Sequence, residues 1–440
     1  MASRKKKRIS LGTVVMLLVT ASVLAGFVLL LPSFTGNQDI FIDAQRLAVA
    51  MDDSLSDLTL FYDENPPLDS LPLATIIPPF TSKSDSGTPA SVPTPIPTPT
   101  VSPIRSFTLC AAGSIELNNE VRKALTIDQF TDYSLLTDQI TQDLQADLSI
   151  AVLQNTISQS NKLSNVNMSA DLLTAIRSAG VNALNIANAN MLNFGEQGLN
   201  ETAEAVRAAG MTPLGFSAPT TLTVNGVNVA LLHYQDRLSS VGRKAANEAQ
   251  QTELIRPVDL PLITSDISAA RTAGAQVIIV TLNWGETGRD QPSDEQIVLA
   301  QAMADAGADI ILGTGNGALQ PVQVLSAQRG DQKYHPVLCA YSLGNLFSPE
   351  RDSRVTLASL LLKTSVVYDT STQTVAFDDL NYTPTYAWRG KDNGRTLQRI
   401  LINDLGNLPA FVDSNQQGVM DRCMTLVRNL MDQTAIPISE

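Results

Sequence analysis

Residues 293–325, SDEQIVLAQAMADAGADIILGTGNGALQPVQVL, carry the pattern that decides the fold. A helical pattern comes first, and the short apolar run Ile310–Leu312 after it predicts a buried strand. The strand opens into a loop with glycine at every second position, namely Gly313, Gly315 and Gly317. Loops at the ends of buried strands commonly carry functional side chains, and this one offers only Thr314 and Asn316.

The same alternation of strand and helix runs through the chain from residue 106 onward. Strands are predicted at residues 107–112, 148–153, 181–187, 211–214 and 277–283, and helices at 128–144, 169–180, 199–210, 263–274 and 415–433. Asn225-Gly226, between two apolar runs, indicates a hairpin. Further strands are predicted at 335–345, 355–369 and 372–380. Early alternation with later strand-rich segments is typical of an α/β protein with mixed sheets.

The N-terminus has the features of a membrane anchor. Residues 4–8 are all basic, and residues 11–31 carry no charge. About 20 apolar residues are enough to cross a bilayer, so residues 11–32 are predicted to form a transmembrane helix. Basic residues on its N-terminal side predict a cytoplasmic N-terminus and an external main domain. A cleaved signal peptide is the alternative, with Val23–Ala25 as the cleavage site, although the apolar run continues to Leu31.

A proline-rich segment separates the anchor from the main domain. Residues 66–103 hold 11 of the 23 prolines, a composition that favours extended conformations and buries no core. We predict a semi-rigid stalk, with a proline-rich recognition motif or a glycosylated stalk as alternatives. The chain therefore divides into a cytoplasmic basic tail (1–10), a transmembrane anchor (11–32), a membrane-proximal segment and linker (33–104), a main domain (105–385) and a C-terminal helical extension (386–440).

Charge and cysteine content limit the class of protein. The formal net charge of −13 argues against a nucleic-acid partner. Three cysteines in 440 residues provide no disulfide framework. Cys110 and Cys339 lie in apolar, strand-like runs and are predicted to be small buried side chains, while a single bridge between two of Cys110, Cys339 and Cys423 stays open.

The loops that follow the predicted strands carry a recognisable series of motifs. They are LNFGEQGLNETAEAVRAAGMTPLG (192–215), NWGETGRDQPSDEQIVLAQAMADAGADIILG (283–313), LQPVQV (319–324) and YSLGN (341–345). In this order they resemble the capsule-synthesis CapA family, known also for the PgsA component of poly-γ-glutamate synthesis. The resemblance covers residues 107–348 and implies a layered α/β sandwich similar to the calcineurin-like metallophosphoesterases.

The resemblance also implies metal-ligand positions, and this sequence departs from the family at each of them. The replacements are Ser114 for aspartate, Gln154 for glutamate, Asn190 for histidine, Asn193 for aspartate, Asn283 for histidine, and Gly315 and Gly317 for two further histidines. Transition metals require imidazole, thiolate or carboxylate ligands, and two-metal hydrolysis requires both ions. The replacements therefore predict a domain with no metal, no cofactor and no catalytic residue.

Other residues could in principle rebuild a metal site. The two histidines, His233 and His335, are predicted to be surface or strand-end residues rather than ligands. Four loop carboxylates could hold a hard cation such as calcium, although their spacing matches no known cage: Glu116, Glu196, Glu286 and Asp290. The GTGNG stretch lacks the spacing of a dinucleotide fingerprint.

The side chains that remain at these loops suit either packing or binding. The simpler interpretation is that they hold turns together; the alternative is a polar groove that binds a polymer by hydrogen bonds and stacking. The residues concerned are Ser114, Gln154, Asn190, Asn283, Trp284, Thr314, Asn316 and Asn345. We therefore predict a non-catalytic, extracytoplasmic protein of the cell membrane that binds an envelope polymer or its synthesis machinery. A hydrolase with an altered metal set, or with no metal, is the second hypothesis.

Overall fold

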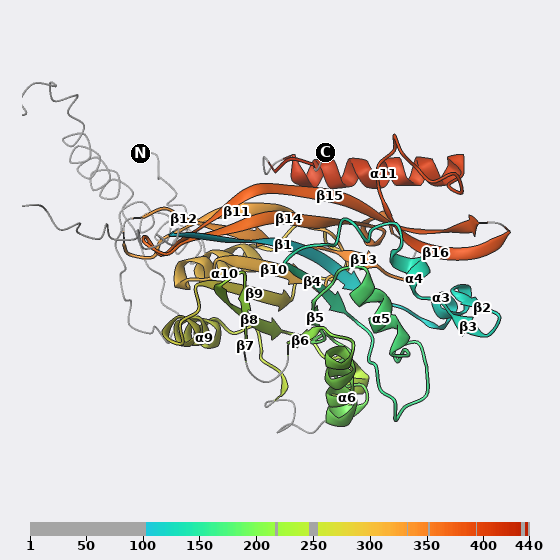
Figure 1. Cartoon of the computed structure of the whole chain (residues 1–440), viewed down its shortest axis with the longest axis horizontal. Helices are drawn as coiled ribbons and strands as arrows, with labels where there is room; N and C mark the ends of the chain where they lie inside the picture. The colour runs from blue at the N-terminus through green and yellow to red at the C-terminus, as the bar shows by residue number, and fades with distance from the viewer. Residues whose placement is uncertain are drawn as a thin grey trace, which may run out of the picture. The chain divides into compact units, whose positions relative to one another are not determined.

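The computed structural model describes residues 103–215, 219–245, 254–331, 333–350, 353–392, 394–432 and 436–438 (Figure 1). They belong to one unit, Ile96–Glu440. The predicted basic tail, the transmembrane anchor and nearly all of the predicted linker lie outside the described residues. Within the described ranges, no helix is long and apolar enough to cross a membrane.

Two β-sheets form the centre of this unit. The first contains, in sheet order, β16 (Arg395–Ile402), β15 (Thr374–Asp392), β14 (Ala358–Asp369), β1 (Ile104–Ile115), β4 (Leu148–Leu153), β5 (Ala183–Asn185) and β6 (Thr212–Leu214), with β13 (Asn345–Phe347) also paired to β1. The second contains β11 (Val322–Ala327), β12 (His335–Ala340), β10 (Ile310–Thr314), β9 (Val277–Asn283), β8 (Val227–Gln235) and β7 (Thr220–Val224).

Both sheets are mixed, as predicted. Strands β1, β4, β5 and β6 run parallel, whereas β14, β15 and β16 are antiparallel to their neighbours. In the second sheet β8, β9, β10 and β12 run parallel, and β7 and β11 are antiparallel edge strands. Parallel strands place their carboxyl ends at one edge, which is where the loops with the predicted site residues begin.

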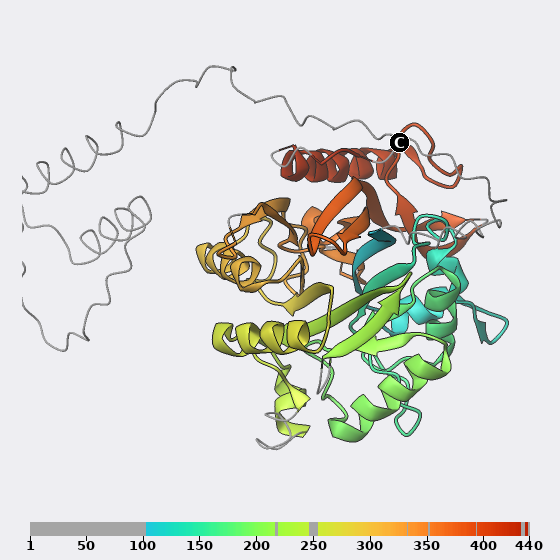
Figure 2. The same ribbon diagram turned by 60° about the vertical axis from the view of Figure 1, so that its left-hand side comes forward.

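Helices cover the outer faces of the sheets. The longer helices are α5 (Asp171–Ser178), α6 (Gly195–Ala208), α9 (Leu260–Thr272), α10 (Asp294–Ala306) and α11 (Ser414–Met431). Helix α9 packs on β8 and β9, α10 packs on β11, and α6 packs on β6. Figure 2 shows α11, in red, lying across the orange strands of the first sheet, which agrees with its contacts to β14 and β15.

The central strands are buried on both faces. Alternate residues of the second sheet, such as Val229 and Ile279, belong to the same hydrophobic core as the first sheet. Their neighbours Ala230 and Ile278 instead pack in a second core with residues of α9 and α10. Burial of both faces explains why these strands read as continuous apolar runs in the sequence.

Short connecting elements complete the described unit. They are α3 (Asn119–Ala124), β2 (Thr126–Ile127), β3 (Phe130–Thr131), α4 (Ser134–Thr137), α7 (Ser240–Ala245) and the 3₁₀ turn η2 (Arg354–Thr356). The hairpin predicted at Asn225-Gly226 joins β7 to β8, and both turn residues have positive φ, 47° and 78°.

Two predictions about secondary structure were wrong. The helix predicted over 128–144 shrinks to α4, because Asp128 and Gln129 have positive φ values, 45° and 72°, which a helix cannot continue. The predicted boundary at residue 385 falls inside β15, which runs to Asp392 and pairs with β16. Only Ser414–Met431 of the predicted C-terminal helical extension is helix, because the apolar residues before it complete the first sheet.

All three cysteines are buried and free. The prediction of small buried side chains at Cys110 and Cys339 is therefore confirmed, and the bridge left open in the sequence does not form. Burial raises the pKa of the Cys110 thiol to about 12, which leaves little reactive thiolate at neutral pH.

Candidate functional site

The carboxyl ends of the parallel strands bring the predicted site residues together. In the first sheet, Ser114 at the end of β1 lies opposite Asn345 of β13. In the second sheet, Asn283 at the end of β9 lies opposite Thr314 at the end of β10. Each strand therefore delivers one polar side chain to the same edge.

Loop backbones join the two sheets at this edge. The Leu343 N–H donates to the Gly313 carbonyl at 2.9 Å, which ties the YSLGN loop to the GTGNG loop. The side-chain nitrogen of Asn345 lies 3.6 Å from the point that a Cβ at Gly317 would occupy. The glycine-rich loop therefore lies directly against the loop that carries Asn345.

A chain of neutral side chains replaces the implied ligands on the first sheet. Gln154 donates from Nε2 to Ser114 Oγ at 3.1 Å, and Asn190 donates from Nδ2 to the Gln154 carbonyl at 3.3 Å. Asn193 then donates to Asn190 Oδ1 at 3.1 Å and accepts from the Ser239 hydroxyl. These residues satisfy one another, and none of them adds a charge that would attract a cation.

On the second sheet, Asn283 fills the space of an absent side chain. A Cβ added to Gly315 would lie 2.0 Å from Asn283 Oδ1, closer than any real contact. Gly315 and Gly317 also have φ values of +97° and +76°, in the left-handed region that favours glycine. A histidine at Gly315 would require Asn283 to move, and a histidine at Gly317 would adopt a strained backbone conformation.

Trp284, Thr314 and Asn316 hold the loops rather than an open surface. Trp284 is 3% exposed and donates from Nε1 to the Tyr341 carbonyl at 2.8 Å. The Thr314 hydroxyl donates to the Leu282 carbonyl at 3.3 Å. Asn316 accepts from the Ser342 hydroxyl and donates to a backbone carbonyl, at 2.7 and 2.9 Å. In this conformation the Trp284 ring is not available to stack on a ligand.

The eight predicted residues therefore gather in one cluster of loops, and that cluster is closely packed. Gln154 and Asn190 are half-buried, whereas the other six are buried. The half-buried side chains that the cluster offers to a ligand include these two amides and their neighbour Asn193.

The residues present do not fit a bound metal. In the part of the chain that the structure describes, no three His, Cys, Asp or Glu side chains converge as a metal site. Glu286 pairs with Arg289 at 2.8 Å, and His335 donates from Nε2 to Asp331 Oδ1 at 2.9 Å. Burial and then the nearby Glu350 carboxylate raise the pKa of Glu116, which disfavours its charged form.

His233 is the residue whose observed position differs most from the predicted one. It was predicted at the surface or a strand end, but it is 8% exposed, on the face of β8 that meets the first sheet. Its Nδ1 lies 2.8 Å from both Asn185 Nδ2 and Thr281 Oγ1. Burial lowers the pKa of His233 to about 3. The period-two pattern of VNVALLHYQ already placed it on the face of the buried Val229.

Comparison with known proteins gives a consistent family assignment. The family model described as "Bacterial capsule synthesis protein PGA_cap" matches residues 108–350. The chain is 32% identical over 190 residues to the capsule biosynthesis protein CapA of Bacillus anthracis, covering 41% of this chain and 44% of that protein. It is 28% identical over 200 residues to the PGA biosynthesis protein CapA of Bacillus subtilis, covering 44% and 49%.

A solved phosphatase structure from Mycoplasma pneumoniae is also similar, with 12% identity, a TM-score of 0.38, and coverage of 64% of this chain and 94% of that one. The matched region spans less than half the length of the two curated relatives. The family match nevertheless covers more than half of this chain and confirms the resemblance that its motifs indicate. The chain belongs to the bacterial capsule synthesis (PGA_cap, CapA) family.

Proposed function

We propose that this protein is a membrane-anchored, extracytoplasmic component of capsule-polymer synthesis whose CapA-like domain works without metal-dependent catalysis. The polymer would be of the poly-γ-glutamate type, because the two Bacillus relatives are named for capsule and PGA biosynthesis. The anchor rests on the apolar run at residues 11–32 and the basic residues before it.

The observation that carries the non-catalytic part is the contact between Asn283 and Gly315. Two-metal hydrolysis lowers the pKa of a bound water and clamps the attacking and leaving oxygens. Both functions need charged or imidazole ligands, and this cluster presents amides, a serine and two glycines in left-handed backbone. The side chain at one implied histidine position also occupies the space that a Cβ at the other, Gly315, would need.

Polymer contact would occur at the exposed edge of the cluster. Gln154 and Asn190 are half-buried there, and the segment that follows β8 crosses the Asn190 loop, since the Ser239 N–H donates to the Ala189 carbonyl at 2.7 Å. Arg237 in that segment is exposed and donates to the Gly285 carbonyl. A cation held at the Gly285 loop, in the segment that also crosses the Asn190 loop, suits a chain of carboxylates and amides, despite the acidic charge of the whole protein.

Binding of poly-γ-glutamate by the detergent-solubilised full chain tests this function. We expect measurable binding that weakens with salt, and a several-fold loss in Arg237→Gln. Arg389→Gln, which changes an exposed arginine on β15, serves as the control and should bind as the wild type does. If the wild type, Arg237→Gln and Arg389→Gln bind the polymer equally well, the polymer does not bind at Arg237.

The hydrolase hypothesis makes a different prediction. Incubation of the full chain with the polymer, with and without manganese or zinc, would then shorten the polymer. Size-exclusion chromatography of the polymer measures this directly. We expect an unchanged size distribution, and metal-dependent shortening would replace the binding role with a catalytic one.

A further inference from the structure

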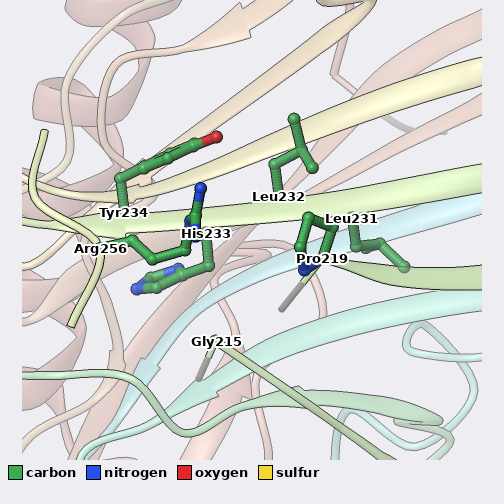
Figure 3. A pocket seen from close by; sticks show the side chains of 7 residues that line it. All are labelled: Gly215, Pro219, Leu231, Leu232, His233, Tyr234 and Arg256. Atoms are coloured by element: carbon green, nitrogen blue, oxygen red, sulfur yellow. The ribbon is translucent and has the colours of Figure 1, made fainter. Parts of the chain in front are cut away.

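A small cavity lies beside β8, away from the loop cluster. Its walls are residues 231–234 of β8 together with Gly215, Pro219 and Arg256, and its volume is about 10 Å³ (Figure 3). Strand β7 begins opposite Leu231, so the cavity lies at the edge of β8 beyond the start of that pairing. This volume accommodates one atom or molecule of about the size of water.

His233 presents a hydrogen-bond donor on the wall of this cavity. Asn185 accepts the Ala187 N–H through Oδ1 at 2.9 Å, so its Nδ2 is the atom that donates to His233 Nδ1. Nδ1 is therefore an acceptor, and since burial keeps the ring neutral, the single ring proton is on Nε2. Nε2 is buried, and within the described part of the chain it has no hydrogen-bond partner.

Arg256 presents a second donor to the same cavity. One of its terminal nitrogens pairs with Asp266, and Asp266 also accepts the Tyr234 hydroxyl at 2.7 Å. The Arg256 Nε–H is buried, and among the described residues no acceptor lies within hydrogen-bond distance of it. Asp266 therefore accepts from the terminal nitrogen of Arg256 and leaves the Nε–H to another acceptor.

We propose that this cavity is a binding site for one small anion of halide size, held between His233 Nε2 and Arg256 Nε. Two buried N–H groups without acceptors cost free energy unless something accepts from them. A water molecule would bring two hydrogens of its own, which need acceptors, and both unpartnered groups here are donors. An anion accepts hydrogen bonds from both donors and brings no hydrogen of its own.

An anion at this position would stabilise the contact between the two sheets. His233 on β8 and Asn185 on β5 are hydrogen-bonded across that contact. Gly215, in the cavity wall, packs so closely on Asn185 that a Cβ there would lie 2.3 Å from Asn185 Oδ1. The bound ion would therefore lie between Arg256 and the same histidine, in a cavity that Gly215 also lines.

Bromide tests the site, because it is a halide that can be located by anomalous scattering. We expect one anomalous peak between the two nitrogens in crystals of the full chain soaked in bromide. In solution, bromide at constant ionic strength should raise the unfolding midpoint by about 2 °C. Arg256→Lys keeps the charge near Asp266 but removes the Nε–H, and His233→Asn keeps an acceptor for Asn185 but removes Nε2. Both should lose the peak and the shift.

Arg289→Lys is the matched control, because it removes an Nε–H from an exposed ion pair that has no cavity. It should retain the wild-type response to bromide, and general salt effects on stability will be the same in all four proteins. Ordinary water density with no anomalous signal at the site would overturn the proposal. An equal bromide shift in wild type and both site variants would overturn it as well.

Discussion

The side chain of Asn283 lies where a side chain at position 315 would have to lie. The 2.0 Å approach and the φ of +97° at Gly315 are independent obstacles, one of packing and one of backbone conformation. A larger side chain at position 315 would therefore need coordinated changes at both positions.

Alanine substitution separates the two obstacles at Gly315. Gly315→Ala should destabilise the protein more than Gly274→Ala, since Gly274 has a similar φ of +91° but nothing within 4 Å of its Cβ position. We expect the free energy of unfolding to fall by roughly 1 kcal/mol in Gly274→Ala and by roughly 2 kcal/mol or more in Gly315→Ala. Urea unfolding measures both. In an Asn283→Ala background the difference should shrink, and an unchanged difference would mean that Asn283 is not the obstacle.

His233 predicts a specific dependence of stability on pH. Its pKa is about 3 in the folded protein and about 6.5 in an unfolded chain, so the unfolded state binds the proton first. The His233 contribution is therefore constant above pH 6.5 and falls as the pH drops from 6.5 toward 3. We expect the wild type to lose about 1.4 kcal/mol per pH unit relative to His233→Asn between pH 6 and 4. Parallel pH profiles of the two proteins would contradict the buried, neutral histidine.

At the residue scale, the sequence predicted which side chains meet but not how they meet. The motif order placed Ser114, Asn283 and Asn345 in one loop cluster, because parallel strands end at one edge. The motif order could not show whether Trp284 lines a groove or packs inside the domain. The position of its ring depends on a hydrogen bond to the Tyr341 carbonyl, which is distant in sequence.

Among the secondary-structure elements, the buried carboxylate of Asp309 links helix α9 to the second sheet. Asp309, fully buried before β10, accepts from Arg271 of α9 at 2.5 Å and from Arg329 at 3.0 Å. It also accepts the Ile278 N–H of β9 at 2.8 Å. Three segments distant in sequence thus share one acceptor, which fixes α9 relative to the strands.

Removal of the buried Asp309 charge should lower the free energy of unfolding far more than removal of an exposed carboxylate charge. Asp309→Asn leaves two guanidinium groups without their carboxylate, and we expect a loss of about 3 kcal/mol. Glu286→Gln breaks the exposed pair with Arg289, which should cost less than about 0.5 kcal/mol. Chemical denaturation of both variants gives the comparison. Similar losses in the two would mean that Asp309 does not act as the link.

Helices and strands could be predicted from the sequence where the local pattern of apolar residues agrees with their burial in the folded domain. Strands β9 and β10 are apolar on both faces, and their runs were found in the sequence. The segment 128–144 has a helical pattern, but its backbone reverses at Asp128 and Gln129, which the pattern does not encode. Residues 386–402 were assigned to the C-terminal extension, but β15 runs past the predicted boundary to Asp392 and pairs there with β16 in a hairpin that continues the first sheet.

At the scale of the whole molecule, a two-sheet domain follows a segment with the sequence of an anchor and a stalk. The first sheet extends through β14, β15 and β16 under α11, so the C-terminal residues belong to the main domain. The anchor and its orientation stay predictions from residues 4–32, which lie outside the described part of the chain. In our proposal the anchor keeps the CapA-like domain near membrane-bound polymer synthesis.

The most direct test of the account is the metal content of the purified full chain. It should be incubated with manganese, zinc and calcium, washed, and analysed by mass spectrometry beside a family member that retains the implied histidine and carboxylate ligands. We predict substoichiometric metal in this protein and a loaded control, because amides and left-handed glycines occupy the ligand positions. Near-stoichiometric metal in this protein would contradict the loss of metal chemistry and favour the hydrolase.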